Sequence, residues 1–473
     1  MSDRWERGAS VDSGYVAETE AQKYRALLHQ VEIEMTSRWG EGRMDPTKER
    51  IQALVDLLGD PQRTYRSIHL TGTNGKTSTA RMIDQLFVAF GLRTGRFTSP
   101  HLTAITERIV LSGEPVDPRT FVEAYDELAP YLNLVDGKFG AKLSFFEVIT
   151  ALAYAIFADA PIDVAVVEVG LGGEWDATNV IDAEVAVVTP IDLDHTGLLG
   201  GTVAEIATEK AGIIKPGAAA ILAAQRPEAA AALLRRAADV GATIAREGLE
   251  FGVLERRLAV GGQLLRLQGL GGEYDEVFLP LHGAHQAQNA ALALAAVEAL
   301  LGAGAGSGPL DANIVRQALG AVRSPGRLET VRSAPTILLD AAHNPHGMAA
   351  TVAAIGEAFS FRRLIGVIGV LADKDARGML DLLEPILDAI VVTQNSSVRA
   401  MPVDDLAAVA LDVFGADRVN VEPRLDDAVE TAVRLAEQSD DDRLAGAGVL
   451  ITGSVITAGE TRALLVRGNS DQP

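Results

Sequence analysis

A glycine-rich segment near residue 72 holds the residue types that a phosphate-binding loop needs. A short apolar run around Ile68 leads into Gly72, Gly75, Lys76 and Thr77, and a helical pattern follows. In a strand–loop–helix arrangement, backbone N–H groups curl around an anion and the helix N-terminus adds partial positive charge. Lysine would reach the terminal phosphates, and the threonine hydroxyl can ligate magnesium. The segment therefore predicts a nucleoside triphosphate site.

This loop departs from the common pattern G-x-x-x-x-G-K-[ST]. Leu70 stands where the first glycine of that pattern belongs. An ordinary glycine turn that caps a helix is the alternative interpretation of the segment.

Three polar residues follow predicted strands and could hold a metal ion. Glu168 ends the apolar run Val164–Val167, His195 comes shortly after Val185–Val188, and Ser99 follows a third strand-like run. Oxygen ligands suit magnesium, so Glu168 and Ser99 fit it, whereas histidine is a less usual ligand. Taken alone, His195 is better interpreted as a structural histidine.

Strands that alternate with helices would position these groups. The predicted strands of the first half are Thr94–Thr98, Val164–Val169, Val185–Ile191 and Ala219–Ala223, and the helices include Lys23–Trp39, Phe121–Leu132, Phe146–Phe157, Val203–Ile213 and His285–Leu301. Such alternation predicts an α/β fold with a mostly parallel sheet covered on both faces. Residues 247–281, with short alternating runs and glycine pairs, predict a small antiparallel patch.

The alternation restarts after Ser324-Pro325-Gly326-Arg327. Further strands are predicted at Thr336–Asp340, Leu364–Val370, Ala389–Thr393 and Val449–Thr452. The expected division is a flexible N-terminal tail (1–22), a P-loop ATP-binding domain (23–323), a hinge (324–328) and a smaller, Rossmann-like α/β domain (329–473). A cleft between two such domains is a natural place for ATP chemistry.

Composition excludes several classes of protein. A net charge of −22 over 473 residues argues against nucleic acid or an anionic membrane as the main partner. The absence of cysteine excludes disulfides, thiolate metal sites and cysteine nucleophiles. No apolar stretch is long enough for a membrane span, and the N-terminus does not resemble a signal peptide, so we expect a cytoplasmic protein.

Several motifs occur in an order that resembles one family. They are Thr71-Gly72-Thr73-Asn74-Gly75-Lys76-Thr77, Thr98-Ser99-Pro100-His101-Leu102, Glu168-Val169-Gly170-Leu171-Gly172-Gly173, Asp176-Ala177-Thr178-Asn179, Asp194-His195-Thr196, Glu209-Lys210-Ala211-Gly212-Ile213, Pro325-Gly326-Arg327 and Asp340-Ala341-Ala342-His343-Asn344-Pro345. From about residue 45 to 465 the chain resembles the bacterial folylpolyglutamate synthases, which are often also dihydrofolate synthases and belong to the Mur ligase superfamily. Mur ligases share the loop but generally carry an additional N-terminal domain.

The resemblance implies a role for individual residues. The residues implied to bind ATP are Gly72, Asn74, Gly75, Lys76, Thr77, Ser78, Asn289, Arg327 and Asp340. Those implied to ligate magnesium, with two ions expected, are Ser99, Glu168 and His195. Lys210 matches a carbamylated lysine of the family, although by sequence alone it is an ordinary helix lysine. Ser144, Trp175, Asp176 and Ala177 fall where the pterin substrate is held. His343 and Ser454 match weaker candidates for the incoming glutamate or the acyl phosphate, and an Asp-x-x-His pair such as Asp340 and His343 can equally be a helix cap.

The implied reaction is an ATP-dependent amide ligation. A carboxylate is a poor electrophile, so ATP must first convert it to an acyl phosphate, which the amine of L-glutamate then attacks. Lys76, Arg327 and magnesium would neutralise the charge on the transferring phosphoryl group. The implied substrates are a folate or dihydropteroate together with L-glutamate. The enzyme is expected to be a monomer. A Mur-type ligase with a non-folate acceptor is the alternative, and a regulatory nucleotide switch is a more distant one.

Two features depart from the family pattern. Glu174 precedes Trp175 where relatives often have a basic residue, and the segment that helps to bind dihydropteroate is only loosely recognisable around Asp45–Ile51. Both concern the acceptor rather than the ATP site.

Overall fold

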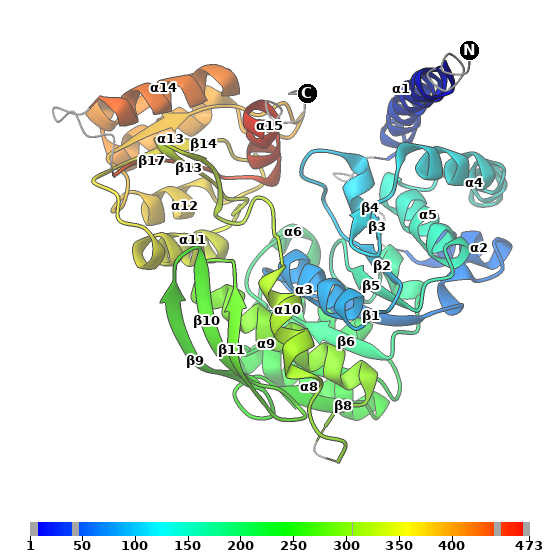
Figure 1. Ribbon diagram of the computed structural model, residues 1–473. Helices are drawn as coiled ribbons and strands as arrows, with labels where there is room; N and C mark the ends of the chain where they lie inside the picture. Colours follow the sequence, from blue (N-terminus) through cyan, green and yellow to red (C-terminus); the bar gives the residue numbers. More distant parts are fainter. Residues whose placement is uncertain (1–7, 40–46, 305, 439–445, 467–473) are drawn as a thin grey trace, which may run out of the picture.

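Two α/β units and a small antiparallel sheet make up the computed structural model of the chain (Figure 1). The structure describes residues 8–39, 47–304, 306–438 and 446–466. The predicted tail and C-terminal domain therefore lie partly outside the described residues. No helix in these described ranges is long and apolar enough to cross a membrane.

The larger unit is built on a sheet of eight strands. In spatial order they are β4 (Glu114–Pro115), β3 (Ile109–Leu111), β2 (Thr94–Phe97), β5 (Val164–Glu168), β1 (Arg66–Thr71), β6 (Val185–Val188), β7 (Ala219–Leu222) and β8 (Thr243–Arg246). All neighbouring pairs are parallel except those made by β3 with β2 and β4. The carboxyl ends of β1, β2, β5 and β6 therefore meet at one edge of the sheet.

Helices cover both faces of this sheet. Because side chains alternate along a strand, Val164 and Val166 of β5 face one core while Ala165 and Val167 face another. The first face is covered by α3 (Lys76–Ala89), α9 (Ala284–Leu301) and α10 (Ala312–Gly320). The second is covered by α1 (Gly8–Ser37), α2 (Glu49–Leu57), α4 (Pro118–Phe139), α5 (Phe145–Asp159), α7 (Val203–Lys210) and α8 (Pro227–Val240), and a short helix, α6 (Thr196–Leu199), lies near α7.

The predicted antiparallel patch is present as a three-stranded sheet. Its strands, in the order β11 (Glu273–Leu279), β10 (Gly262–Gln268) and β9 (Gly252–Ala259), pack against α9 and α10 and share their core.

The smaller unit holds a second, six-stranded sheet. In spatial order its strands are β12 (Glu329–Ser333), β13 (Thr336–Leu339), β17 (Ala447–Thr452), β14 (Arg363–Ile368), β15 (Ala389–Val392) and β16 (Val419–Val421), and only β12 is antiparallel. One face is covered by α11 (Pro345–Ala358), α12 (Ala376–Leu383) and α13 (Val403–Phe414), and the other by α14 (Leu425–Glu437), with α15 (Val455–Val466) at the chain's end. The predicted α/β class is confirmed in both units.

The N-terminal segment differs from its prediction. Helix α1 begins at Gly8, so residues 8–22, predicted as a flexible tail, are helical, while residues 1–7 lie outside the described part. The second half of α1 packs on α4, where the Tyr24 hydroxyl donates to Glu123 at 2.8 Å. Once that half is anchored, adding turns costs little because helix propagation is much easier than nucleation.

Candidate active site

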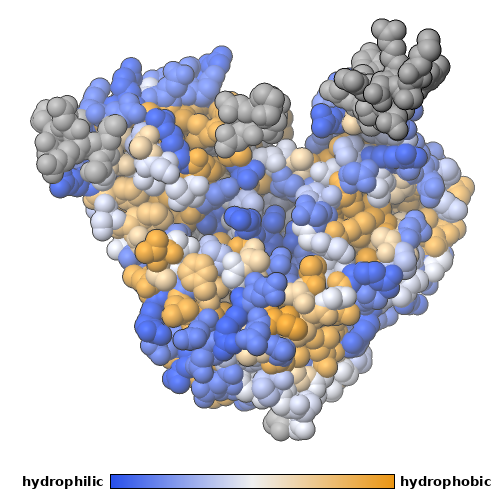
Figure 2. All heavy atoms as spheres, viewed as in Figure 1, coloured by the Kyte–Doolittle hydropathy of each residue, from blue (hydrophilic) through white to orange (hydrophobic). Residues whose placement is uncertain are grey.

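A cavity of about 650 Å³ opens where the two α/β units meet. Figure 2 shows hydrophilic side chains gathered in the hollow between them. It is lined by these residues predicted from the sequence: Gly72, Asn74, Gly75, Lys76, Thr77, Ser78, Ser99, Ser144, Glu168, Trp175, Asp176, Ala177, His195, Lys210, Asn289, Arg327, Asp340 and His343. The structure thus brings together groups from loops that are up to about 270 residues apart, as the contact of Asn74 with Asn344 illustrates.

The glycine-rich loop joins β1 to α3. Leu70, at the position of the missing glycine, is fully buried within β1, and the turn is made instead by Gly72. A Cβ at Gly72, whose φ is +143°, would lie 1.9 Å from the Thr189 hydroxyl oxygen, so a larger residue cannot fit. The Lys76 ammonium donates to the carbonyls of Gly72 at 3.1 Å and Thr73 at 3.2 Å.

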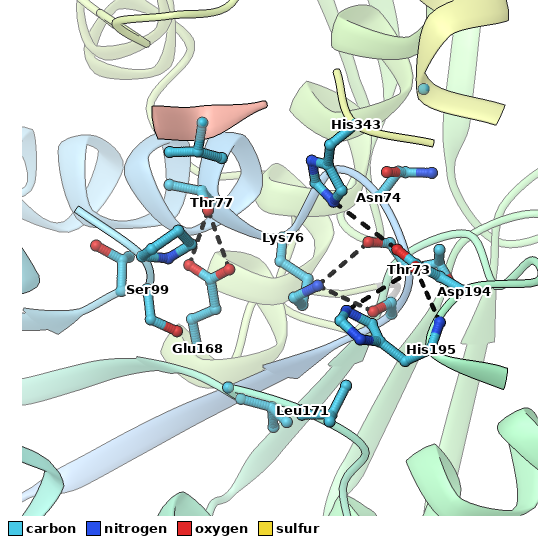
Figure 3. Close-up of a pocket in the computed structure, with 18 of the residues that line it drawn as sticks. Thr73, Asn74, Lys76, Thr77, Ser99, Glu168, Leu171, Asp194, His195 and His343 are labelled. Carbon is cyan, nitrogen blue, oxygen red and sulfur yellow. Dashed lines mark hydrogen bonds and ion pairs between the residues drawn. The ribbon is translucent and has the colours of Figure 1, made fainter. Parts of the chain in front are cut away.

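A buried carboxylate lies beside this loop, at the end of β5. Glu168 is 1% exposed, and its two carboxylate oxygens lie 3.0 and 2.9 Å from the Thr77 hydroxyl, which donates its one hydrogen to this carboxylate. Burial raises the pKa of Glu168, and the nearby Lys76 charge opposes that rise. Figure 3 shows Ser99 next to the same carboxylate. The Ser99 backbone N–H donates to this carboxylate, so the structure places Thr77, Ser99 and Glu168 together.

His195 lies on the other side of Lys76 (Figure 3). Its Nε2 is 3.4 Å from the Lys374 ammonium and 3.9 Å from Asp194, and burial lowers its pKa to about 4. No group of three or more histidine, cysteine or acidic side chains with metal-site geometry occurs within the described residues. His195 and Glu168 are thus two separate positions rather than one cluster.

An ionic network around Asp194 links the two units. Lys374 of the smaller unit pairs with Asp194 at 2.6 Å, and the Asn344 amide donates to the same carboxylate at 3.0 Å. Burial would raise the pKa of Asp194, but the charges of His195 and Lys374 hold it below its ordinary value. Asn74 of the glycine-rich loop also contacts Asn344 and His346, at 3.2 and 2.8 Å.

Lys210 ends helix α7 inside the cavity. It is 4% exposed, and its ammonium donates to the Gly72 carbonyl at 2.9 Å. Burial, together with the neighbouring Lys76 charge, lowers the pKa of Lys210 to about 7. A large share of this amine is therefore unprotonated near neutral pH.

The residues predicted to hold the nucleotide lie beyond the loop toward the smaller unit. Asn289 is buried on α9, next to Gly75, and its amide donates to Gln286 at 3.2 Å. The Arg327 side chain forms no hydrogen bond or ion pair with any residue of the described chain. The Asp340 carboxylate accepts from the Leu328 and Ala342 N–H groups at 3.0 and 2.9 Å, so it also holds the connection between the units.

The residues predicted for the pterin part of the acceptor line the cavity from loops of the larger unit. The Ser144 hydroxyl caps α5 in a reciprocal arrangement with Glu147. Asp176 is 2% exposed and accepts from the N–H groups of Leu171 and Thr178, both at 2.9 Å. These two side chains therefore shape the loops, and Trp175 and Ala177 complete this part of the wall.

The unusual acidic residue before Trp175 has a partner. Glu174 forms an exposed ion pair with Lys48 at 3.0 Å. Residues 45 and 46 of the loosely recognised acceptor segment lie outside the described part of the chain, whereas Thr47 and Arg50 line the cavity.

His343 and Ser454 have different surroundings. His343 lines the cavity with its Nδ1 3.0 Å from the Ala341 carbonyl, and burial lowers its pKa to about 4. Ser454 does not line it: the residue is 1% exposed, and its hydroxyl accepts from the Thr457 N–H at 2.9 Å and caps α15. Its neighbours Val455 and Ile456 reach the cavity instead.

Two family models match the two units of the chain. The Mur ligase middle domain matches residues 70–297, and the Mur ligase glutamate ligase domain matches residues 326–455. A dihydrofolate synthase/folylpolyglutamate synthase of Mycobacterium tuberculosis is 52% identical over 93% of this chain and 94% of its own length. The chain belongs to the folylpolyglutamate synthase family.

The chain is also similar to other members of the folylpolyglutamate synthase family, in sequence and in structure. The Lacticaseibacillus casei enzyme is 35% identical over 89% of this chain and 95% of its own length. A structure of the Mycobacterium tuberculosis folylpolyglutamate synthase complexed with ADP has a TM-score of 0.90 and 51% identity, covering 95% of this chain and all of its own. An FPGS–AMPPCP–folate complex has a TM-score of 0.80 at 32% identity and covers 93% of this chain and 99% of its own.

Sequence reasoning missed part of the cavity wall in this family member. Lys374, Arg399 and Asp373 line it from the smaller unit, and Arg81 lines it from α3. The segment Leu371-Ala372-Asp373-Lys374-Asp375 follows strand β14 and is rich in charge, which was an available signal. Arg81 falls one turn after Thr77 on α3, so helical spacing could have indicated it.

Proposed function

We propose that this protein is an ATP-dependent ligase that joins L-glutamate to a folate, and that it also accepts dihydropteroate. The observation that carries this conclusion is one cavity, in a chain of the folylpolyglutamate synthase family, that spans from the phosphate-binding loop to both the acceptor wall and the smaller unit. We also take a single chain to be the active form.

The glycine-rich loop and α3 bind the triphosphate of ATP. Their backbone N–H groups and the helix N-terminus face the phosphates, and Lys76 adds a full charge after leaving the Gly72 and Thr73 carbonyls. Arg327, which has no protein partner of its own in the described residues, supplies a second charge from the connection between the units. These groups neutralise the charge that collects on the transferring phosphoryl group.

Magnesium suits the residues beside the loop. Glu168 is a buried carboxylate next to two hydroxyls, which is an all-oxygen donor set of the kind that hard cations prefer. Thr77, Ser99 and Glu168 would hold one ion, and His195 would contribute to a second. Bound there, magnesium stabilises negative charge on the phosphoryl group.

Lys210 is carbamylated in the active enzyme. Carbamate formation requires an unprotonated amine to attack carbon dioxide and release a proton, and the pKa of about 7 provides that amine. The product is an anion beside Lys76, whose positive charge offsets that of the carbamate.

Ligation then proceeds in two balanced steps. A carboxylate oxygen of the acceptor attacks the γ-phosphorus and ADP leaves, giving an acyl phosphate. The amine of glutamate attacks the acyl carbon, phosphate leaves and the amine loses a proton. The smaller unit, residues 329–473, presents the glutamate, and closure about the hinge at 324–328 excludes water that would hydrolyse the intermediate.

The test is ATP- and glutamate-dependent phosphate release with dihydropteroate and tetrahydrofolate as parallel acceptors, and with the amide products identified by mass. Products from both acceptors are expected. Product from tetrahydrofolate alone would limit the enzyme to polyglutamylation, and ATP binding without either product would exclude folates as acceptors.

A further inference from the structure

Arg81 is a cation inside the cavity that the proposed mechanism does not use. It lies in the second turn of α3, four residues after Thr77, and lines the cavity. Within the described chain its guanidinium makes no hydrogen bond and no ion pair. Burial and the Arg96 charge lower its pKa to about 10, so it is protonated at neutral pH.

The acidic groups around Arg81 are all engaged with other donors. Glu107 accepts from the N–H groups of Leu102, Thr103 and Ala104 at 2.9, 3.0 and 3.1 Å. Asp84 pairs with Arg96 at 2.6 Å.

Glu168, as described above, accepts from Thr77. A partly buried guanidinium with no protein acceptor requires an anion or water in the cavity, since it cannot be left unsolvated without a large cost.

The other cations of the cavity are largely accounted for. Lys374 pairs with Asp194, Arg399 with Asp373 at 2.7 Å, and Arg50 with Glu147 at 3.1 Å. Lys76 and Lys210 bind loop carbonyls, and Arg327 is assigned to the nucleotide.

Among the described cations that line the cavity, Arg81 is therefore the one left for a further anion. Its planar fork matches a carboxylate, which it can bind with two parallel hydrogen bonds.

We propose that Arg81 binds a non-reacting carboxylate of a glutamyl group. This inference rests on the proposed function, because that function brings such carboxylates into the cavity. Two sources share the chemistry: the glutamate tail of a folate acceptor, and the incoming glutamate. Dihydropteroate distinguishes them, because it lacks a glutamyl group and its one carboxylate is the reacting one.

The experiment uses the full chain with Arg81→Gln and Arg81→Lys. Arg235→Gln is the matched control, because Arg235 is an exposed arginine of α8, also without a hydrogen bond or ion pair among the described residues, and lies outside the cavity. Thermal unfolding of each variant establishes that it folds. KM and kcat are measured for ATP, glutamate, tetrahydrofolate and dihydropteroate, and binding of glutamate and tetrahydrofolate is measured by calorimetry.

Arg81→Gln is expected to raise the KM of one carboxylate substrate, either tetrahydrofolate or glutamate, about 10- to 100-fold. A loss of this size is typical when a charged hydrogen-bonded pair is removed. Arg81→Lys should recover part of that loss, and the KM for ATP should not change. If the KM rises for tetrahydrofolate but not for dihydropteroate, Arg81 binds the glutamate tail of the acceptor. If the KM for glutamate rises with both acceptors, Arg81 binds the incoming glutamate.

Other outcomes would overturn the proposal. These are a change in the KM for ATP alone, a fall in kcat with every KM unchanged, or behaviour equal to that of Arg235→Gln. If the wild-type protein forms no amide yet binds glutamate or tetrahydrofolate in an Arg81-dependent manner, the proposed function fails while this inference stands.

Discussion

Two lysines share one backbone carbonyl at the centre of the cavity. Lys76 and Lys210 both donate to the Gly72 oxygen, at 3.1 and 2.9 Å. Two buried ammonium groups at such a short distance disfavour each other's charged form. Burial also lowers the pKa of both lysines. Burial lowers the pKa of Lys210 to about 7, and Lys76 is also held by the Thr73 carbonyl. In the proposed mechanism, one residue type thus serves two roles: Lys76 is the phosphate-binding cation and Lys210 the reactive amine.

Replacing Lys210 by methionine tests this difference in protonation. The folded pKa of about 7 lies below the ordinary value of 10.5, so between these values the unfolded chain binds more protons than the folded chain. The wild-type protein therefore loses stability as pH falls from about 10 to 7, by up to about 1.4 kcal/mol per pH unit. Lys210→Met lacks this loss, so its stability relative to wild type should grow as pH falls and level off below about 7.

Urea unfolding at several pH values, in buffer stripped of carbon dioxide, measures that difference. A stability gap that is the same at pH 7 and pH 9 would show that Lys210 is not the depressed amine inferred here.

Lys76→Ala should abolish ligation without unfolding the protein. The side chain bonds only to carbonyls of its own loop, so the fold loses little, whereas the terminal phosphates lose a full positive charge. We expect a loss of at least about 100-fold in kcat/KM, within the range attributed to removing a charge-stabilising group from a transition state. Product formation and thermal unfolding, measured together, check this, and near-normal turnover would contradict the phosphate-binding role.

Sequence reasoning found Lys76 and Lys210 but not Lys374. The first two stand in motifs whose spacing or family resemblance singled them out. The Lys374 side chain acquires its role from Asp194, which is 180 residues away in sequence. That pairing depends on how two units pack together, which local spacing does not encode. Ser454 shows the opposite case, because a motif position proved to be a buried helix cap while its neighbours line the cavity.

Among the elements, the buried parallel strands were the easiest to predict. Strands β5, β6 and β15 are covered on both faces, so each is a run of apolar residues, which in β5 ends at Glu168. The edge strands β4, β8 and β16 were missed, since they are short and partly exposed and lack such runs. The predicted helix Val203–Ile213 is present as helix α7, which ends at Lys210. One turn of 3-10 helix follows over Ala211–Ile213.

Helix α15 touches the loop after β2 at a glycine. A Cβ at Gly459 would lie 1.9 Å from the Leu102 carbonyl oxygen, so this helix of the smaller unit packs directly on the backbone of the larger one. Gly459→Ala should therefore push the two elements apart, lower the free energy of unfolding by roughly 1–3 kcal/mol as overpacking does, and reduce ligation.

Gly356→Ala is the matched control, because Gly356 lies in α11 and a Cβ there would have no atom within 4 Å. Alanine there should stabilise the helix by about 0.5–1 kcal/mol. Urea unfolding and ligation assays of both variants measure the contrast. If Gly459→Ala behaves like Gly356→Ala, the close approach of α15 does not constrain the two units.

At the scale of the whole molecule, the active cavity exists only where the two units meet. The larger unit supplies the glycine-rich loop, Glu168 and Lys210, and the smaller unit supplies His343 and Lys374. Two polar contacts between the units, Asp194 with Lys374 and Asn74 with Asn344, involve residues of the cavity, whereas others, such as Arg256 with Glu357 at 2.7 Å, lie outside it. Substrate binding and domain arrangement therefore act on the same side chains, so a ligand that engages them also changes how the units are held.

The Asp194–Lys374 pair should contribute to holding the units together far more than an exposed pair does. The two side chains are 11% and 7% exposed, so Lys374→Met leaves a nearly buried carboxylate without its main cation. Removing one partner of a buried pair costs about 3–5 kcal/mol. Asp194→Asn together with Lys374→Met should cost less than the sum of the two single changes, because neither charge is then left alone.

Arg377→Met is the control for this cycle. Arg377 pairs with Asp412 on the same unit, but both side chains are about 60% exposed, and such pairs contribute about 0–1 kcal/mol. Urea unfolding gives the free energies, and small-angle X-ray scattering of the nucleotide-free protein reports whether the units separate. We expect a larger radius of gyration for Lys374→Met, a partial return in the double variant and no change for Arg377→Met. Additive effects of the two single changes, with an unaltered radius, would mean that the units are held by their apolar contacts and that Lys374 is free to serve a ligand.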